Sequence, residues 1–592
     1  MLFIYITILF SHAFIEPYLL YVDDTTPKNW LSSDPSIILK IQKLDFSHNI
    51  FNISVSKSDN ESKWHYVYYD IPIIKEQFVY AKTYIRLVDK KDSLGVGVTI
   101  GFIDENGNRI DFVEERLTEP TKTFVPIHLY GKTPIGTSKI RVTLFIHNQG
   151  ALECYEPIIS TPWHLEQKQN EVTLHINNKP LKKKLLGFGA EDDGRFYDTN
   201  NKIEGVDDEA VQLRKERIIS IQPHWVRTFA WFKDWDPKDD GLSFTFDSDG
   251  MQSLYKTIEE YQKLNTIVNI TCVNWGIPYP WEDVDKRTNS IVALLKHLIK
   301  NKGFNNIKYF TLTNEPNYFF YTKGNRFDKY KELHKKLKER FKKEGLSIQI
   351  VGSDDAMGTD WFQKCLEDKD YQSYVNIWAS HFYWQYNTVY FADKLFHERI
   401  ELMNKYVKNN KHHIFTVTEF GVTDQRFKPP SINPIMQEYK GALYSVALII
   451  DGLNQGVSGY SLWCLQEVRY PGLKEPMRMG LWGYKDKNWQ IYPMYYAMKM
   501  FTNNTAQGNK IYPIKSSNPT YFKSVRLGNR IFWVNLSDKE IKVKFNKKLN
   551  MKSALYYEGN ENNVHDITEN KDYSINREYI RLPKESFGIF KF

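Results

Sequence analysis

The feature that most constrains the fold is an alternation of short apolar runs and longer amphipathic stretches between about residues 186 and 500. Each apolar run is continuous, which is typical of strands buried on both faces of a parallel sheet. The longer stretches carry their charges along one side, which is typical of helices that cover such a sheet. The runs are LLGFGAE (185–191), HWVRTF (224–229), TIVNITCV (266–273), IKYFTLTNE (307–315), SIQIVGSD (347–354), VNIWASHFY (375–383), HIFTVTEF (413–420) and VSGYSLWC (457–464).

Eight such strand–helix units predict a (β/α)8 TIM barrel over residues 185–502. The intervening helices are expected at 206–221, 285–301, 326–345 and 391–410, among others. The alternative is an open doubly wound sheet, in which a G-x-G-x-x-G turn commonly follows the first strand. The first run ends in GFGAEDDG (187–194), which lacks that spacing. The barrel is therefore favoured.

Two further β-rich regions flank the predicted barrel. Short strand-like runs separated by turn signals predict an N-terminal β-sandwich or jelly roll over residues 30–164. Residues 503–592, together with 168–184, predict a C-terminal β-sandwich. Aromatic residues crowd one N-terminal run at Trp64, Tyr66, Tyr68 and Tyr69. These aromatics either form the sugar-binding surface of a carbohydrate-binding module or fill the inner face of the sandwich.

The first residues predict a signal peptide over 1–20 and thus a secreted, extracellular protein. Met1 to Phe14 is an apolar run that is too short to span a bilayer, which takes ~20 residues. No Lys or Arg precedes Lys28, so a buried first strand is the other interpretation. No later stretch is long and apolar enough for a membrane span.

Charge and cysteine usage exclude several classes of function. The formal net charge of +8 comes from short basic runs without a dense Arg/Lys stripe, so a nucleic-acid partner is not expected. The four cysteines are widely spaced and contain no CxxC pair, which argues against a disulfide scaffold and against the common zinc sites. No metal and no cofactor are expected. The sequence carries no signal of an oligomeric state.

In a TIM barrel the active-site residues lie at the C-terminal ends of the strands. Two carboxylates end apolar runs there, Glu315 in TLTNEP on the fourth strand and Glu419 in TVTEFG on the seventh. Glycoside hydrolysis needs two carboxyl groups that flank the bond, one protonated and one ionised. The predicted strand ends together bring Glu191, Arg227, Asn274, Asn314, Glu315, Asp354, His381, Tyr383, Glu419 and Trp463 to one mouth of the barrel.

This set resembles the signature of glycoside hydrolase clan A. Asn314-Glu315-Pro316 on strand four and Glu419 on strand seven carry the resemblance, and Arg227, His381-x-Tyr383 and Trp463 match it on strands two, six and eight. The NEPN sequence at 314–317 and the barrel-plus-sandwich layout are most similar to family 39, with families 5 and 30 close. The resemblance covers the barrel and the C-terminal sandwich, but not residues 30–164.

The resemblance implies a retaining β-glycosidase that acts on an extracellular oligo- or polysaccharide. Glu315 would be the acid/base and Glu419 the nucleophile, with carboxyl groups ~5–5.5 Å apart. The substrate-binding roles that it implies are as follows: Asn314 binds the sugar 2-hydroxyl, Arg227 and Tyr383 hold Glu419 ionised, His381 organises this network, and Trp463 forms the floor under the sugar.

Each supporting residue also has a purely structural interpretation. Arg227 could pair with a buried carboxylate, His381 could be a core histidine, and Trp463 could fill the core. Trp231, Trp275 and Trp384 each follow a strand and either line outer sugar subsites or pack. The acidic cluster Glu191-Asp192-Asp193 either binds hydroxyls of the terminal sugar or caps the next helix.

Two other classes of function compete with this interpretation. A non-catalytic carbohydrate-binding protein on a hydrolase-like barrel would keep the aromatics and lose a carboxylate, whereas both glutamates are present here. A metal-dependent TIM-barrel hydrolase would need clustered His and Asp at strand ends, where His381 alone qualifies among the histidines. The identity of the sugar and the choice between exo and endo cleavage stay open at this stage.

Overall fold

The computed structural model describes most of the chain. The described residues are 30–32, 37–43, 49–55, 63–73, 78–91, 94–160, 171–273, 281–319, 327–356, 359–407, 414–428, 432–470, 473–547, 553–560, 563–564 and 579–592. The predicted signal peptide (1–20), Asn274 and Trp275 lie outside them.

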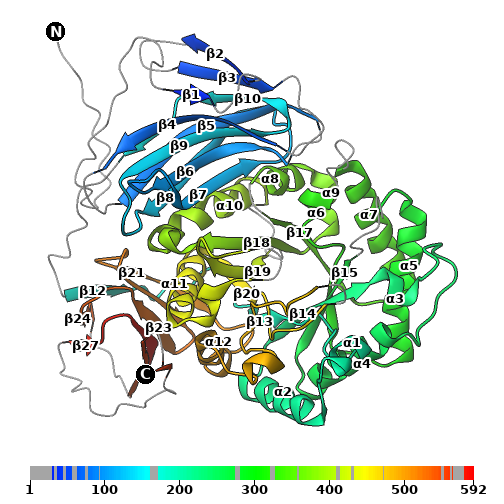
Figure 1. Cartoon of the computed structure of the whole chain (residues 1–592). Coiled ribbons are helices and arrows are strands. Elements are labelled where there is room, and N and C mark those ends of the chain that lie inside the picture. Colours follow the sequence, from blue (N-terminus) through cyan, green and yellow to red (C-terminus); the bar gives the residue numbers. More distant parts are fainter. Residues whose placement is uncertain are drawn as a thin grey trace, which may run out of the picture. The chain divides into compact units, whose positions relative to one another are not determined.

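Eight parallel strands close into a barrel, which confirms the predicted fold class (Figure 1). Each strand lies within one of the apolar runs or extends it by a few residues, and most of its residues are buried. The strands are β13 (Gly187–Glu191), β14 (Trp225–Trp231), β15 (Ile267–Val273), β16 (Ile307–Thr311), β17 (Gln349–Ala356), β18 (Ile377–Gln385), β19 (Ile414–Thr423) and β20 (Val457–Leu462).

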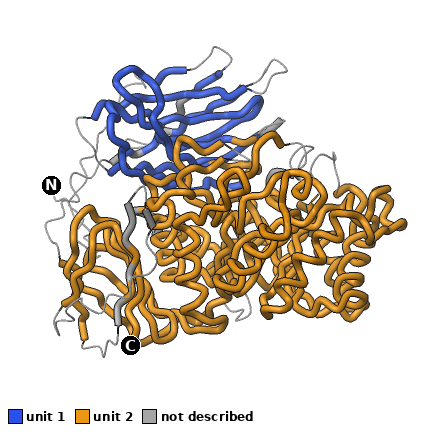
Figure 2. The backbone as a smooth tube through the Cα atoms, turned by 60° about the horizontal axis from the view of Figure 1, so that its bottom comes forward, with its two compact units in different colours: residues 1–89, 96–115, 121–168 blue, residues 90–95, 116–120, 169–592 orange. Residues whose placement is uncertain are grey.

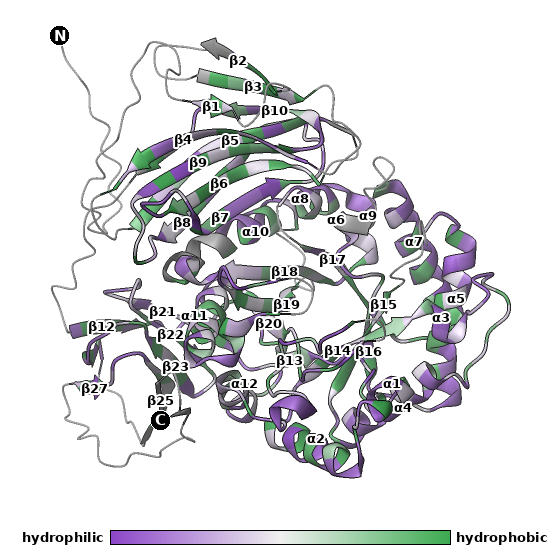
Figure 3. Cartoon of the chain, viewed as in Figure 1, coloured by the Kyte–Doolittle hydropathy of each residue, from purple (hydrophilic) through white to green (hydrophobic). Residues whose placement is uncertain are grey.

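Helices connect the barrel strands and cover their outer side. Many begin at a side-chain cap, as where Asp207 accepts a hydrogen bond from the Ala210 N–H at the start of α2. Figure 3 shows hydrophilic and hydrophobic residues alternating along α2 and α7, as expected of helices with one face on the barrel. The helices are α1 (Thr199–Ile203), α2 (Asp208–Ile221), α3 (Phe232–Trp235), α4 (Asp249–Lys263), α5 (Val284–Lys296), α6 (Pro316–Phe319), α7 (Phe327–Lys343), α8 (Asp360–Glu367), α9 (Lys369–Tyr374), α10 (Ala392–Tyr406), α11 (Tyr439–Gln455) and α12 (Pro493–Asn503).

The barrel closes tightly between β13 and β14 because position 189 is a glycine. A Cβ atom at Gly189 would lie 1.8 Å from the carbonyl oxygen of Trp225 on the next strand. No other residue therefore fits at this contact without moving the two strands apart.

Three register shifts interrupt the ladders on the side of the barrel that carries the predicted site. They lie between Ser353 and Asp355 of β17, at His381 of β18, and between Val417 and Phe420 of β19. A bulge of this kind changes which side chains face inward and often occurs next to an active site. These three strands therefore present consecutive polar residues to the barrel mouth.

A nine-stranded sheet accompanies the barrel, and β12, which precedes the barrel in sequence, pairs with β21 and β24 of this sheet. Apolar side chains of β12, β24 and β27 share one cluster with those of β22, β23 and β28, so the sheet folds over on itself. Its strands, in order, are β26 (Asn563–Val564), β25 (Ser553–Asn560), β28 (Ser586–Lys591), β23 (Arg530–Asn535), β22 (Phe522–Leu527), β21 (Ile511–Ser516), β12 (Glu171–Ile176), β24 (Ile541–Phe545) and β27 (Ile580–Leu582).

Helix α11 joins this sheet to the barrel. It contacts β19 and β20 of the barrel as well as β21, β22 and β23 of the sheet. Almost all of its residues are buried, as expected of a helix that is apolar all round. Its single carboxylate, Asp451, forms an ion pair at 2.6 Å with Lys523 of β22, and both side chains are buried.

The chain forms two compact units (Figure 2). The first comprises residues 1–89, 96–115 and 121–168, and the barrel and the nine-stranded sheet belong to the second. Two antiparallel sheets make up most of the first unit. One has the order β1 (Leu31–Ser32), β4 (Trp64–Pro72), β9 (Lys139–His147), β6 (Val96–Ile103) and β7 (Arg109–Leu117); the other has β11 (Ile158–Ser160), β5 (Phe78–Lys91), β10 (Gln149–Tyr155), β3 (Asn49–Val55) and β2 (Ile37–Lys43), with β8 (Val125–Lys132) beside β5.

Three of the four crowded aromatics of β4, namely Trp64, Tyr66 and Tyr68, do not fill the inner face of this sandwich, whereas Tyr69 shares the face of the buried His65 and Val67. His65 and Val67 are almost fully buried, whereas Tyr66 is 38% exposed and its neighbours Trp64 and Tyr68 are half-buried. Successive side chains of a strand point to opposite faces. Trp64, Tyr66 and Tyr68 therefore share the face that is turned away from the core of this sandwich.

No helix within the described ranges combines the length and the apolar character that a bilayer crossing requires.

The buried ion pair between Asp451 and Lys523 yields a test of how the sheet is attached to the barrel. Removing one partner leaves an uncompensated buried charge, so Asp451→Ala should lower the free energy of unfolding by about 3–5 kcal/mol, measured by urea denaturation. The double variant Asp451→Leu/Lys523→Met, which removes both charges, should recover most of this loss. Equal losses in the single and double variants would show that the ion pair itself is not the source of the effect.

Candidate active site

The structure brings the predicted residues together at the mouth of the barrel, with one difference in where Glu315 lies. The run 307–315 was expected to be strand throughout, but β16 ends at Thr311. Glu315 instead follows a short loop and directly precedes Pro316, the first residue of α6. Its φ of 44° places it in the left-handed region, which a non-glycine residue adopts at an energetic cost and often at a functional site.

Arg227 is the centre of the site. Its side chain is completely buried on β14, and its guanidinium donates to three groups. Nη1 donates to Glu419 Oε2 at 3.0 Å, and Nη2 donates to Asp354 Oδ2 at 2.9 Å and to Asn314 Oδ1 at 2.6 Å. The planar guanidinium thus fixes residues from β17, β19 and the loop after β16 relative to one another.

Asp354 is a member of this network to which the sequence assigned no role. It is completely buried at a φ of 55°, accepts a hydrogen bond from Thr418 Oγ1 at 2.6 Å, and lies 3.2 Å from Nε2 of His381. Burial alone would raise the pKa of its carboxyl group, but Arg227 and His381 hold that pKa below the ordinary value. The only signal in the sequence was its position at the end of the fifth apolar run.

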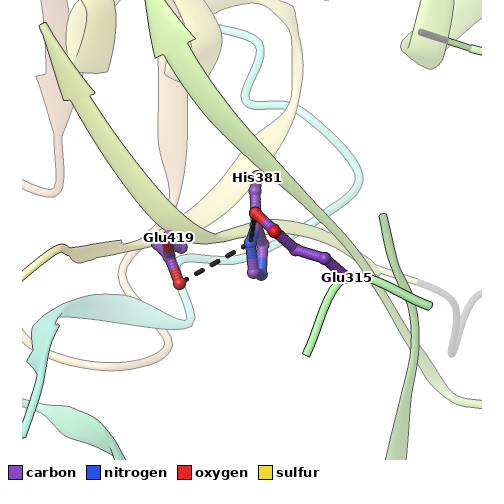
Figure 4. Close-up of side chains that lie close together, drawn as sticks. All are labelled: Glu315, His381 and Glu419. Atoms are coloured by element: carbon purple, nitrogen blue, oxygen red, sulfur yellow. Dashed lines mark hydrogen bonds and ion pairs between the residues drawn. The ribbon is translucent and has the colours of Figure 1, made fainter. Parts of the chain in front are cut away.

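His381 connects the two glutamates. Its Nδ1 lies 3.1 Å from Glu315 Oε1 and 3.6 Å from Glu419 Oε2 (Figure 4). Its Nε2 faces Asp354. Burial opposes its positive charge, but the charges of Asp354 and Glu419 and the hydrogen bonds to Asp354 and Glu315 raise the pKa of His381 to about 10. His381 is therefore an imidazolium at neutral pH, whose Nδ1–H donates a hydrogen bond to Glu315 and whose Nε2 side forms an ion pair with Asp354.

Glu419 is buried between these donors. Tyr383 Oη donates to its Oε1 at 2.8 Å, opposite the contact that Arg227 makes with Oε2. Burial raises the pKa of Glu419 above the ordinary value and the charge of Glu315 adds to this, while His381, Arg227 and Tyr383 oppose it. The expected support from Arg227 and Tyr383 is thus present, although burial outweighs it.

The two carboxylates face each other across a short gap. One oxygen of Glu315, one oxygen of Glu419 and a ring nitrogen of His381 all lie within 4.8 Å of one another. Carboxyl groups about 5–5.5 Å apart are typical of retaining glycosidases, whereas inverting enzymes hold theirs ~6.5–9.5 Å apart. The two groups also differ in burial, because Glu419 is almost fully enclosed and the side chain of Glu315 is 22% exposed.

The same three atoms are also placed closely enough to bind a metal ion. Their electrostatic setting disfavours this use, because a metal needs a neutral imidazole nitrogen and His381 has a pKa of about 10. Both ring nitrogens of His381 also already face carboxylates.

Trp463, the predicted floor beneath the sugar, lies within the described part of the structure. It follows β20 and is 7% exposed, its indole N–H points to Met477 Sδ at 3.0 Å, and its ring contacts Phe229. At the end of β14, the cationic groups of Arg195 and Lys233 each lie over the ring of Trp231, 4.7 Å from its centroid. Trp384 packs in the hydrophobic core, stacked on Phe382, and so does not line a sugar subsite.

The acidic cluster after β13 does not cap the next helix, because Asp198 is the N-cap of α1. Asp192 pairs with Arg214 at 2.5 Å and accepts a hydrogen bond from Tyr261. Glu191 and Asp193 line the same small pocket as Asp192, together with Gln466 and Tyr470. The sequence thus located this cluster, but it gave no means of separating the structural Asp192 from its two neighbours.

Comparison with known proteins identifies the fold. No protein-family model matches the chain, and no curated protein matches its sequence. Among solved structures, the catalytic domain of GH30 xylanase C from Talaromyces cellulolyticus matches with a TM-score of 0.52 and 14% identity, over 71% of this chain and 99% of that one. The chain has the clan A glycoside hydrolase fold.

Two further solved structures have a fold similar to that of this chain. A conserved exported protein from Bacteroides fragilis matches with a TM-score of 0.51 and 13% identity, over 71% of this chain and 99% of its own. SrfJ from Salmonella typhimurium matches with a TM-score of 0.51 and 11% identity, over 84% of this chain and 99% of its own. At such identities the likeness establishes the fold, and the argument for function rests on the residues of the site.

Two buried histidines with opposite surroundings test the electrostatics of the site. His334 is buried among aromatic rings, and burial lowers its pKa to about 4 despite a hydrogen bond to the Tyr330 carbonyl. Histidine-selective ¹⁵N NMR at pH 7 should therefore show a cationic ring for His381 and a neutral ring for His334, with His381→Gln and His334→Gln used for assignment. A neutral His381 at pH 7 would contradict the network described here.

The same shift has a consequence for stability. Because the pKa of His381 is about 10 in the folded state and ~6.5 in the unfolded state, this group stabilises the fold fully below pH ~6.5. The contribution is lost as the pH rises through about 10.

Proposed function

We propose that this protein is a retaining β-glycosidase that hydrolyses an oligo- or polysaccharide, with Glu315 as acid/base and Glu419 as nucleophile. The proposal depends on one observation: the carboxylates of Glu315 and Glu419 lie close together but differ in burial and in hydrogen-bond partners. Glu419 is enclosed and receives hydrogen bonds from Arg227 and Tyr383, while Glu315 is more exposed and contacts His381. A nucleophile needs a fixed, ionised carboxylate, and an acid/base needs access to the leaving group and to water.

In the first step, protonated Glu315 gives its proton to the glycosidic oxygen as the bond from this oxygen to the anomeric carbon breaks. An oxygen of Glu419 attacks the anomeric carbon from the opposite face and forms an ester bond. The aglycone leaves as an alcohol, and Glu315 is left ionised.

In the second step, ionised Glu315 takes a proton from a water molecule, whose oxygen attacks the anomeric carbon. The ester bond to Glu419 breaks, its electron pair returns to the carboxylate, and Glu315 is protonated again. Two inversions leave the released sugar with the configuration that the substrate had.

The cations of the site support both steps. Arg227 and the His381 imidazolium lie beside Glu419 and stabilise the negative charge that this residue carries before attack and regains on release. Because these groups are fixed by Asp354, they need not reorganise during the reaction. Tyr383 holds the other oxygen of Glu419 and thereby orients the carboxylate toward the substrate.

Two other residues are assigned to substrate binding. Asn314 accepts from Arg227 through its amide oxygen, which leaves its NH₂ group to donate to the sugar 2-hydroxyl. Trp463 adjoins the site through Phe229, over whose ring the Arg227 guanidinium lies, and serves as the apolar floor beneath the sugar ring. Trp275 keeps its predicted role in an outer subsite.

Secretion and a second sugar-binding surface extend the proposal. The apolar N-terminal run supports export of the protein, and its substrate is then an extracellular glycan. Residues 30–164 serve as a carbohydrate-binding module, which the outward-facing Trp64, Tyr66 and Tyr68 support. The alternative for the whole chain is a non-catalytic carbohydrate-binding protein on this barrel, which would bind glycans and release no sugar.

Azide rescue tests both glutamates. On a panel of aryl β-glycosides, Glu315→Ala and Glu419→Ala should each lower kcat/KM by at least about 10²–10⁴-fold, the usual range for an acid/base group. Azide should then give a β-glycosyl azide with Glu315→Ala, by attack on the glycosyl-enzyme, and an α-glycosyl azide with Glu419→Ala. Glu332→Ala, which removes an exposed carboxylate on α7, is the matched control and should keep the wild-type rate.

A near-normal rate in either alanine variant would show that the assignment of that glutamate is wrong. Wild-type protein that binds glycans but hydrolyses none of the panel would favour the non-catalytic alternative.

A further inference from the structure

Asp354 lies at the centre of the site but takes part in no step of the proposed reaction. Its side chain on β17 is completely buried. Its Oδ2 accepts from Arg227 Nη2 at 2.9 Å, and its Oδ1 lies 3.2 Å from Nε2 of His381. Thr418 Oγ1 also donates to Oδ1, at 2.6 Å. This carboxylate is therefore enclosed by two cations and a hydroxyl group of the protein, away from solvent.

The backbone of β17 directs Asp354 and its neighbour Asp355 to different partners. The register of β17 against β18 shifts between Ser353 and Asp355, and Asp354 adopts a φ of 55°. Asp355 is equally buried, but it accepts from Ser380 Oγ at 2.9 Å and lies 3.5 Å from Nη2 of Arg399 on α10. A left-handed conformation costs energy in a residue with a side chain and often occurs at functional sites. Here it accompanies the one carboxylate of this pair that enters the site.

Charged groups on neighbouring strands and loops surround the ring of His381. Asp354 on β17 faces Nε2 at 3.2 Å, whereas Glu315 after β16 and Glu419 on β19 face Nδ1 at 3.1 Å and 3.6 Å. Arg227 on β14 binds two of these carboxylates, Asp354 and Glu419. Burial lowers the pKa of His381, but the surrounding carboxylates raise it to about 10. The charge of His381 thus depends on counter-charges at both of its nitrogens.

The two glutamates that face Nδ1 change their charge during the proposed reaction. Glu419 is ionised before attack and neutral as an ester in the glycosyl-enzyme, while Glu315 is protonated before the first step and ionised after it. Asp354 keeps its charge throughout. Burial raises its pKa, but Arg227 and His381 outweigh burial and hold that pKa below the ordinary value. The counter-charge at Nε2 is therefore constant, whereas the one at Nδ1 moves between two residues.

We propose that Asp354 is a positioning residue, whose constant negative charge keeps His381 charged and Arg227 in place while the two glutamates change their charge. The proposal rests on the proposed glycosidase function and deepens it. Asp354 supports the second step in particular, because the imidazolium of His381 stabilises the negative charge that Glu419 regains when the ester bond breaks. Asp354 acts through these cations and is not itself a catalytic residue.

The titration of His381 tests this role without a substrate. Asp354→Asn keeps the shape of the side chain and removes its charge, so histidine-selective ¹⁵N NMR should show the midpoint of the His381 titration falling by about 1–3 pH units, the usual effect of losing an opposite charge at this distance. Asp355→Asn removes an equally buried carboxylate from the next position of β17 and is the matched control, which should leave the midpoint unchanged. An unchanged midpoint in Asp354→Asn would overturn the proposal.

A trapped glycosyl-enzyme makes the second step measurable by itself. The reagent is the 2,4-dinitrophenyl 2-deoxy-2-fluoro derivative of the best aryl β-glycoside of the panel, whose fluorine slows both steps and whose leaving group needs no proton in the first. In wild type and Asp355→Asn, the rate of reactivation should fall to half near the His381 pKa of about 10. In Asp354→Asn this half-point should move down together with the His381 midpoint, by about 1–3 pH units. An equal loss of rate at every pH would indicate a merely structural role and contradict the proposal.

A second variant keeps the proposal testable if Asp354→Asn does not fold. In Glu315→Gln trapped with the same reagent, neither side chain that faces Nδ1 of His381 carries a charge, because Glu419 is esterified. Asp354 is then the remaining carboxylate in contact with the ring. His381 should still be cationic at pH 7 by ¹⁵N NMR. A neutral His381 in this trapped protein would overturn the proposal.

These outcomes separate the role of Asp354 from the proposed function. If wild-type protein hydrolyses no glycoside and no trapped form appears, yet Asp354→Asn lowers the His381 midpoint, the glycosidase proposal fails and the counter-charge assignment stands. If glycosides are hydrolysed through Glu315 and Glu419 but the midpoint is the same in wild type and Asp354→Asn, the assignment of Asp354 alone fails.

Discussion

The arrangement of the site depends on one buried cation. Arg227 has no access to solvent, so the cost of removing its charge from water must be offset by partners held at hydrogen-bond distance. Asp354 and Glu419 supply the opposite charges, and Asn314 supplies a neutral acceptor. These partners come from three neighbouring parts of the barrel. Their positions are therefore set by the same requirement, and the loss of any one charged partner would leave buried charge without compensation.

Around this cation the barrel places acidic and basic side chains in nearly equal number. Arg227 and the His381 imidazolium face Asp354 and Glu419, and His381 also contacts Glu315, the more exposed of the two glutamates. The backbone contributes to this arrangement. Glu315 and Asp354 adopt positive φ angles, and register shifts in β17, β18 and β19 allow adjacent residues to face the same centre. A strained backbone conformation persists where the surrounding contacts stabilise it. Here the stabilising contacts are those that position the two glutamates.

The barrel could be predicted from the sequence because strands that are buried on both faces have continuous apolar sequences. The eight apolar runs coincide closely with β13 to β20. It also placed Glu419, Arg227, His381 and Tyr383 on the correct strands, and it assigned Glu315 to the end of a strand that in fact stops at Thr311; their roles stay proposals. It missed what depends on local geometry. The early end of β16 and the bulges have no periodic signal, and the part played by Asp354 follows from contacts among strands that are distant in sequence.

The most direct test of the central claim is the configuration of the first sugar released. Proton NMR of a hydrolysis reaction on a β-glycoside, recorded before mutarotation, reports the anomer that the protein produces. We expect the β-anomer to appear first, because two successive displacements at the anomeric carbon, between two glutamates that each place an oxygen within 4.8 Å of the other, restore the original configuration. Initial release of the α-anomer would mean a single displacement by water and would contradict the assignment of Glu419 as nucleophile.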